Sequence, residues 1–184
     1  MRVIAGKAKG HRLKVPKDSR LRPTSDLIRG AIFSMLDSLS TDYSRVLDLY
    51  AGTGALGIEA LSRGALSADF VERKPQNCTI IKQNLEHTGF GSQARVYCCN
   101  VQKALTFLSS SYAVVLLDPP YATPFLHDML RKLFASPLVG ENSKVVLEHS
   151  KHFQPESNYG DFPLAISRRH GDTCISIYLR RAKT

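Results

Sequence analysis

Apolar residues are spaced in two ways along this chain, and segments of the two kinds alternate. Between residues 26 and 39 they recur three and four positions apart, the spacing of a helix with one buried face. Residues 112–117 are an unbroken apolar and aromatic run, typical of a strand buried on both faces. The predicted helices are 23–39, 54–64, 75–89, 101–110 and 124–136, and the predicted strands are 45–50, 68–72, 94–99, 112–117 and 143–149. This alternation predicts an α/β fold with a mostly parallel sheet covered by helices on both faces.

The two ends of the chain have patterns of their own. Residues 164–181 form two strand-like runs around a His-Gly-Asp turn, a hairpin that would close the sheet antiparallel. The first fifteen residues place two glycines between short apolar pieces, which predicts a second, smaller hairpin. We therefore expect a basic N-terminal extension over residues 1–22 and one larger domain over residues 23–184.

Composition favours one folded, soluble domain. The 184 residues are 43% hydrophobic and 22% charged, an ordinary globular composition. No apolar run approaches the roughly 20 residues of a membrane span, and the N-terminus lacks the apolar core of a signal peptide. We therefore expect a cytoplasmic protein with no membrane partner. The four cysteines include no C-x-x-C pair and two are adjacent, which favours free thiols over a disulfide or a metal site.

The net charge of +9 is concentrated at the two ends of the chain. Residues 1–30 hold nine Lys or Arg against two acids, a net +7, and residues 168–184 carry a net +4, which leaves −2 for the rest. A near-neutral body with basic ends fits a domain that meets a polyanion, because clustered cations release counterions from phosphates. The candidate RNA-binding residues are Lys7, Lys9, Arg12, Lys14 and Arg22. Alternatively, these charges only keep a small hairpin in solution.

Polar or glycine-rich positions follow the carboxyl ends of the predicted parallel strands, where ligands bind in such sheets. They are Asp48, the loop Gly52-Thr53-Gly54, Glu72, Asn100 and Asp118. The stretch GTGALG, which starts at residue 52, fits G-x-G-x-x-G, and Glu72 follows the first strand at roughly the 20-residue offset of a ribose-binding acid. This motif alone fits nicotinamide cofactors as well as adenosyl cofactors.

Asp48 helps to separate the two cofactor classes. A carboxylate directly before the glycine loop would repel a pyrophosphate, but it would attract a ligand with an ammonium or sulfonium group. S-adenosylmethionine carries both cations, and its ribose suits Glu72. Alternatively, Asp48 is a helix N-cap or a loop anchor. For Asn100, a role in a turn competes with a contact to the adenine amino group. The candidate cofactor-binding residues are Asp48, Ala51, Gly52, Thr53, Gly54, Glu72 and Asn100.

The sequence Asp118-Pro119-Pro120-Tyr121 follows the apolar run 112–117. The amino nitrogen of a nucleobase is a poor nucleophile because its lone pair is delocalised into the ring, and acceptors for its N–H groups would localise that lone pair. The Asp118 carboxylate and the Pro119 carbonyl supply two acceptors, and the prolines fix the backbone direction without adding N–H donors. Tyr121, or Phe125 just beyond, offers a face on which an extruded base can stack. We therefore take Asp118, Pro119 and Tyr121 as candidate catalytic residues of an amine-methylating site.

Several stretches of the chain resemble, in order and spacing, the bacterial ribosomal RNA small-subunit methyltransferase D family. They are MRVIAGKAKGHRLKVP, RPTSDLIRGAIFSML, FVERKPQN, VVLLDPPY and GDTCISIYLRR, while VLDLYAGTGALGIEALSRGA and DPPY look like motifs I and IV of the amino-group methyltransferases. The resemblance implies a single Rossmann-like class I methyltransferase domain with a seven-stranded sheet, which methylates N2 of a guanine in small-subunit rRNA. It also implies that Asp118 and Tyr121 serve the target amine and base. The cofactor-holding residues that it implies are Asp48, Gly52, Gly54 and Glu72.

One position departs from the family pattern, and other functions stay open. Gly30 stands where the family usually has an acidic residue, which puts any contact made by that acid in doubt here. We expect a monomer that transfers the methyl group directly and in line, with no cysteine nucleophile, to small-subunit rRNA or to an assembling small ribosomal subunit. The alternatives are an adenine-N6 DNA methyltransferase, another amino-group methyltransferase, and a non-catalytic RNA-binding assembly factor on the same fold.

Overall fold

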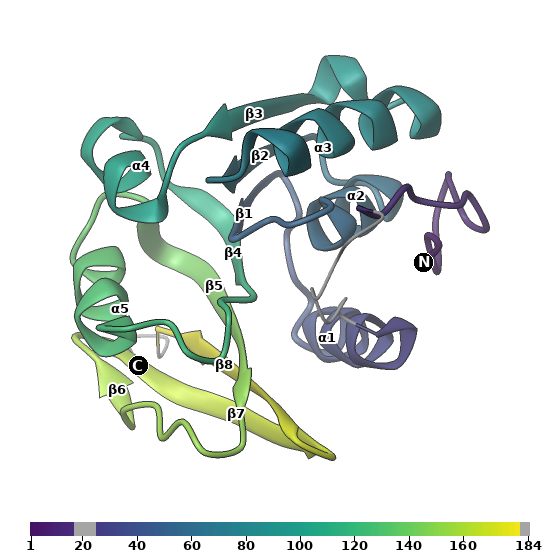
Figure 1. The fold of residues 1–184 in the computed structure, drawn as a ribbon. Helices are drawn as coiled ribbons and strands as arrows, with labels where there is room; N and C mark the ends of the chain where they lie inside the picture. The colour runs from purple at the N-terminus through teal and green to yellow at the C-terminus, as the bar shows by residue number, and fades with distance from the viewer. Residues whose placement is uncertain (17–24, 181–184) are drawn as a thin grey trace.

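The computed structural model describes residues 1–16 and 25–180, and its described strands form one mixed sheet (Figure 1). The sheet has eight strands in the order β3-β2-β1-β4-β5-β8-β7-β6. Their bounds are β1 (Arg45–Leu49), β2 (Ser67–Glu72), β3 (Ala94–Cys98), β4 (Tyr112–Leu117), β5 (Val139–Ser150), β6 (Asn158–Tyr159), β7 (Phe162–His170) and β8 (Thr173–Leu179). The first five strands are parallel, and β8 lies antiparallel between β5 and β7. The predicted Rossmann-like α/β fold, with its antiparallel C-terminal hairpin, is confirmed.

The count of seven strands is wrong by one short strand. Strand β6 has only two residues and pairs antiparallel with β7 at the edge of the sheet. A two-residue strand is too short to show an alternating pattern, so its sequence reads as a turn. Strand β5 also begins four residues earlier than predicted, because its first part is polar and pairs with β4 through an irregular register.

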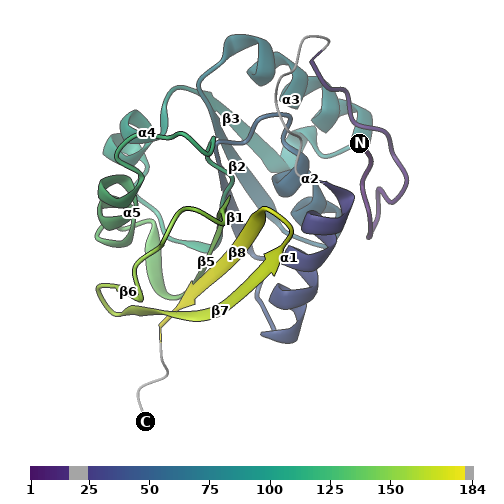
Figure 2. The same cartoon turned by 60° about the horizontal axis from the view of Figure 1, so that its bottom comes forward.

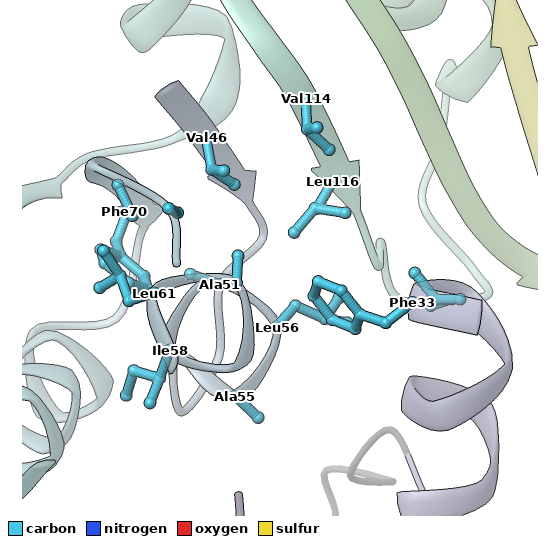
Figure 3. Close-up of a cluster of buried hydrophobic side chains, with 14 of the residues drawn as sticks. Phe33, Val46, Ala51, Ala55, Leu56, Ile58, Leu61, Phe70, Val114 and Leu116 are labelled. Carbon is cyan, nitrogen blue, oxygen red and sulfur yellow. The ribbon is translucent and has the colours of Figure 1, made fainter. Parts of the chain in front are cut away.

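Five α-helices cover the two faces of the sheet (Figures 1 and 2). They are α1 (Asp26–Ser38), α2 (Ala55–Ser62), α3 (Pro75–Thr88), α4 (Val101–Phe107) and α5 (Leu126–Phe134), with the short 3-10 helix η1 (Gly91–Gln93) after α3. Helices α1, α2 and α3 share one core cluster with Val114 and Leu116 of β4, and α4 and α5 share the other with Val115 and Leu117. This alternation buries β4 on both faces, as its continuous apolar sequence predicts. In Figure 3, Phe33 of α1 and Leu56 of α2 point toward each other within the first cluster.

Helix ends follow local chemistry that the sequence carries. The Ser25 side chain accepts a hydrogen bond from the Ile28 N–H at the start of α1. Gly89 closes α3 with a φ of 78°, a backbone conformation that glycine adopts without strain. None of the described helices is long and apolar enough to cross a membrane.

Residues 1–16 form a tight loop on helix α2 (Figure 1). Its two halves pair through backbone hydrogen bonds and a single antiparallel bridge between Arg2 and Arg12, so the small hairpin exists with minimal pairing. The Glu59 carboxylate of α2 accepts hydrogen bonds from two backbone N–H groups of this loop, at 2.7 and 3.0 Å. A Cβ at Gly6 would lie 1.8 Å from the Ser62 carbonyl oxygen, so only glycine permits this approach. The predicted division of the chain at residue 22 stays a prediction, because residues 17–24 lie outside the described residues.

Candidate active site

The carboxyl ends of the parallel strands line a cavity of about 650 Å³ that gathers most of the predicted site residues. Those that line it are Asp48, Ala51, Gly52, Thr53, Glu72, Asn100, Asp118, Pro119 and Tyr121. Gly54 lies just behind the cavity wall, as the N-cap of α2 with a φ of 80°, and packs against Ile81. One cavity therefore joins the residues predicted for the cofactor to those predicted for the target amine.

Asp48 ends β1 and is almost fully buried, with 1% of its surface exposed. Its Oδ2 accepts a hydrogen bond from the Gly57 N–H in α2 at 2.9 Å. Burial raises the pKa of this carboxyl from 3.8 to about 8, and the nearby Asp118 and Glu72 act in the same direction. Asp48 thus anchors α2, as one of the two interpretations holds, but it also lines the cavity. Its carboxyl is mostly neutral at pH 7 until a cation approaches.

The third glycine of the GTGALG motif lets α2 come close to the sheet. A Cβ at Gly57 would lie 2.3 Å from Cε1 of Phe70 on β2 and 3.1 Å from Oδ2 of Asp48. No side chain larger than hydrogen fits there, and without this close approach the Gly57 N–H could not reach Asp48. The glycine motif is therefore explained by packing as much as by ligand access.

Glu72, at the end of β2, is held by two backbone amides. Its Oε2 accepts from the Gly52 N–H at 3.0 Å and its Oε1 accepts from the Lys74 N–H at 2.8 Å. A carboxylate has about four acceptor positions, so both oxygens retain an acceptor position beyond these two bonds. The side chain is 7% exposed and lines the cavity. The two amides fix the carboxylate and the glycine loop relative to each other.

Asn100 takes the turn role that competed with an adenine contact. Its side-chain oxygen accepts from the Lys103 N–H at 2.8 Å and caps helix α4. Asn100 also lines the cavity, beside Val101 and Gln102. Capping uses the side-chain oxygen, so a contact from its amide nitrogen to a ligand is compatible with the cap.

The Asp118-Pro119-Pro120-Tyr121 sequence follows β4, which pairs with β1, so this sequence and Asp48 lie at neighbouring strand ends. The Tyr121 hydroxyl hydrogen-bonds the Thr173 Oγ1 of β8 at 2.6 Å, and 43% of the residue surface stays exposed. Phe125 was the other candidate for stacking on a base. It is 75% exposed and is absent from the cavity lining, so the cavity presents Tyr121.

The cavity includes residues that the sequence reasoning missed. Glu148 on β5, His170 before the β7–β8 turn and Thr173 on β8 line it beyond Asp118. Glu148 ends an apolar run just as Asp48 and Glu72 do, and that signal could have identified it. Met1, Val15 and Pro16 of the N-terminal loop also line the cavity.

A fully buried guanidinium, that of Arg29 on α1, lies near the Glu148 carboxylate. Its Nη2 donates to the Arg2 carbonyl at 2.6 Å and to Asp26 Oδ1 at 2.8 Å. Burial lowers the pKa of Arg29, while the carboxylates of Asp26, Glu59 and Glu148 oppose that shift. The N-terminal loop, α1 and β5 are thus linked through one buried cation.

The basic residues predicted to bind RNA lie on the N-terminal loop, outside the cavity lining. The side chains of Lys7, Lys9, Arg12 and Lys14 are exposed, and Arg22 lies outside the described residues. Asn84 of α3 joins this loop to the glycine loop: its Oδ1 accepts from the Lys14 N–H at 2.8 Å, and its Nδ2 donates to the carbonyls of Lys14 at 3.1 Å and Thr53 at 3.0 Å. The basic loop is therefore a fixed wall beside the cavity.

Comparison with known proteins agrees with this geometry. Residues 1–179 match the family described as "Conserved hypothetical protein 95". The chain is 34% identical over 184 residues to "Putative rRNA methyltransferase YlbH" of Bacillus subtilis, covering 98% of this chain and 100% of that one. It is 28% identical over 183 residues to "Ribosomal RNA small subunit methyltransferase D" of Escherichia coli, covering 100% and 91%.

The fold comparison gives the same result. The solved Escherichia coli structure "Putative methyltransferase yhhF" superposes with a TM-score of 0.87 at 28% identity, covering 100% of this chain and 99% of that one. With the cavity described above, these similarities establish the predicted resemblance. The chain belongs to the conserved hypothetical protein 95 family, a family of S-adenosylmethionine-dependent methyltransferases of small-subunit rRNA.

Proposed function

We propose that this protein transfers the methyl group of S-adenosylmethionine to the exocyclic N2 of a guanine in small-subunit rRNA. The observation that carries the proposal is the single cavity that spans the ends of β1, β2 and β4. Its one side has the buried acids Asp48 and Glu72, and its other side has the Asp118-Pro119-Pro120-Tyr121 sequence. A methyl donor and an acceptor amine bound on these two sides would meet between neighbouring strands.

The residues on the β1 and β2 side fit the cofactor. Ionised Asp48 would complement its ammonium or sulfonium group, and a buried carboxyl with a raised pKa is one that a ligand cation would ionise. Glu72, held by two backbone amides, would accept from the ribose hydroxyls with its remaining lone pairs. The bound cofactor supplies an electrophilic methyl group.

The residues after β4 would prepare the amine. The Asp118 carboxylate and the Pro119 carbonyl would accept hydrogen bonds from the two N–H groups, which turns the nitrogen lone pair toward the methyl group. As the N–C bond forms, positive charge grows on the nitrogen, and these acceptors stabilise it. The nitrogen then releases one proton. Tyr121, whose hydroxyl is tied to Thr173, would hold the extruded base by stacking.

The exposed basic residues of the N-terminal loop support RNA as the substrate. Lys7, Lys9, Arg12 and Lys14 project from a loop that Glu59 and Ser62 hold on α2. A rigid basic surface beside the cavity would gain by releasing counterions from the phosphates around the target nucleotide. Part of the same loop lines the cavity, so RNA bound there lies next to the base site.

Asp118→Ala is the direct test of this mechanism. Loss of an acceptor that stabilises growing charge should lower the rate of N2-methylguanosine formation by about 100-fold or more, with the fold and cofactor affinity retained. The substrate is small-subunit rRNA, bare and reconstituted with ribosomal proteins, and the product is identified by mass spectrometry of nucleosides. Asp128→Ala is the matched control, because Asp128 is exposed on α5 and pairs only with Arg131. Near wild-type turnover in Asp118→Ala would overturn the mechanism.

A further inference from the structure

The part of the cavity beyond β4 has a definite chemical character. Strand order places β1 and β2, with the cofactor residues, on one side of β4, and β5 and β8 on the other. If a target amine points at Asp118 with the methyl donor over β1, the rest of its base extends over β5 and β8. The cavity residues there are Tyr121, Glu148, His170 and Thr173. These side chains therefore surround the ring that carries the amine.

Glu148 is the buried acid of this region. Leu117 of β4 pairs in register with Leu147 of β5, so the next residues, Asp118 and Glu148, lie at neighbouring strand ends. Side chains alternate along a strand, and Leu116 and Val146 share the core cluster on the α1 face. Asp118 and Glu148 follow each of them by two positions, so both lie on that face. Glu148 is 5% exposed, lines the cavity, and is electrostatically favoured by the buried Arg29.

Guanine differs from the other bases that carry an amine in the group beside that amine. In guanine, the ring nitrogen N1 next to the C2 amine carries a proton and donates a hydrogen bond. In adenine and cytosine, the ring nitrogen on the Watson–Crick edge next to the amine is an acceptor. A buried carboxylate beside the amine site would pair with the guanine N1–H, whereas it would face a lone pair in adenine or cytosine.

We propose that Glu148 accepts the N1–H of the target base and thereby selects guanine over other amines. This inference rests on the proposed function and names the residue that sets its base specificity. Asp118 and the Pro119 carbonyl take the N2 hydrogens, Glu148 takes the adjacent N1 hydrogen, and Tyr121 stacks on the ring. The simpler alternative is that Glu148 only neutralises Arg29, as Asp26 does through its 2.8 Å contact.

The test compares guanine with 2-aminopurine at the methylated position. 2-Aminopurine keeps the exocyclic 2-amino group, but its N1 has a lone pair and no proton. The wild-type protein first identifies the N2-methylguanosine position in reconstituted small ribosomal subunits. Semisynthetic rRNA with guanosine or 2-aminopurine riboside at that position is then assembled in the same way. The quantity compared is the ratio of kcat/KM for the two bases.

The wild-type protein should prefer guanine by about 100-fold or more, because a site built to accept a hydrogen bond rejects a base that cannot donate it. In Glu148→Gln the side-chain amide can donate to the bare N1, so the preference should fall by at least about tenfold. Asp26→Asn is the matched control: it removes a carboxylate from Arg29 outside the cavity lining, and it should keep the wild-type preference.

Each failure of this test has a separate meaning. If no N2-methylguanosine forms on any small-subunit substrate, the proposed function and this inference both fall. If the product forms but the wild-type protein methylates 2-aminopurine as well as guanine, only the inference falls, whether or not the variant folds. An unchanged preference in Glu148→Gln, or an equal loss in Asp26→Asn, assigns Glu148 to charge balance alone and overturns the inference.

Discussion

The buried carboxyl of Asp48 should couple cofactor binding to pH. Its pKa is raised to about 8, mainly by burial, so at neutral pH most ligand-free molecules carry this carboxyl in its protonated form. A cationic ligand is stabilised by the ionised form, so binding below pH 8 must release the Asp48 proton. The affinity for S-adenosylmethionine should therefore rise with pH between about 6 and 8 in the wild-type protein, because ionisation becomes less costly.

The pKa sets the size of the effect. With a pKa of about 8, roughly 1% of the carboxyls are ionised at pH 6 and about 10% at pH 7, and each tenfold change corresponds to about 1.4 kcal/mol. Affinity should then weaken up to about 100-fold from pH 8 to pH 6, with close to one proton released for each ligand bound at pH 6. The α-amino group of the ligand titrates at about 7.7–8.0, but it gains charge as the pH falls and so opposes this trend.

Asp48→Asn separates the two titrations. Its amide oxygen can still accept from the Gly57 N–H, but the side chain has no proton to release. Calorimetry at pH 6 to 9, in buffers of different ionisation enthalpy, counts the protons released on binding. The variant should bind more weakly at pH 8 and should show only the titration of the ligand. Equal proton release by the wild type and Asp48→Asn at pH 6.5 would refute the role of Asp48.

The same carboxyl should make the ligand-free fold less stable as the pH rises. Its pKa in the folded protein lies above its ordinary value of 3.8, so the folded state binds this proton more tightly than the unfolded chain does. The contribution to the free energy of unfolding is complete below about pH 4 and is lost progressively up to about pH 8. Between pH 5 and 8 the loss is on the order of 4 kcal/mol. Urea denaturation should show this loss in the wild type and not in Asp48→Asn.

Two glycine-to-alanine changes within helices should move the free energy of unfolding in opposite directions. Gly57→Ala should cost about 2–3 kcal/mol, because its Cβ would overlap Phe70, whereas Gly30→Ala should stabilise the fold by up to about 1 kcal/mol, because no atom lies within 4 Å of its Cβ. Urea midpoints that shift alike would contradict both packing arguments. Replacing four exposed side chains by Ser should weaken RNA binding and flatten its salt dependence by roughly 0.7–0.9 per lost phosphate contact; an unchanged slope in a folded variant would mean that they only solubilise the loop. Those four are Lys7, Lys9, Arg12 and Lys14.

The sequence by itself determined which segments form strands and helices and where ligand chemistry lies along the chain. A continuous apolar run such as Tyr112–Leu117 can only be a strand buried on both faces, and the residue after it must lie at a sheet edge. The same reasoning placed Asp48 and Glu72 at strand ends, since local periodicity and chain direction suffice for it. The DPPY stretch was recognisable because two prolines and an acid impose a local geometry that needs no distant partner.

Only the tertiary structure decided what these residues experience. The protonation of Asp48 depends on burial under α2 and on carboxylates from two other strands, and a one-dimensional pattern does not contain that environment. Glu148 became a cavity residue because β5 pairs beside β4, and strand order is not encoded in the spacing of apolar residues. The basic N-terminal loop, predicted from charge as an extension, is fixed to α2 by the buried Glu59, a long-range contact that no local signal reveals.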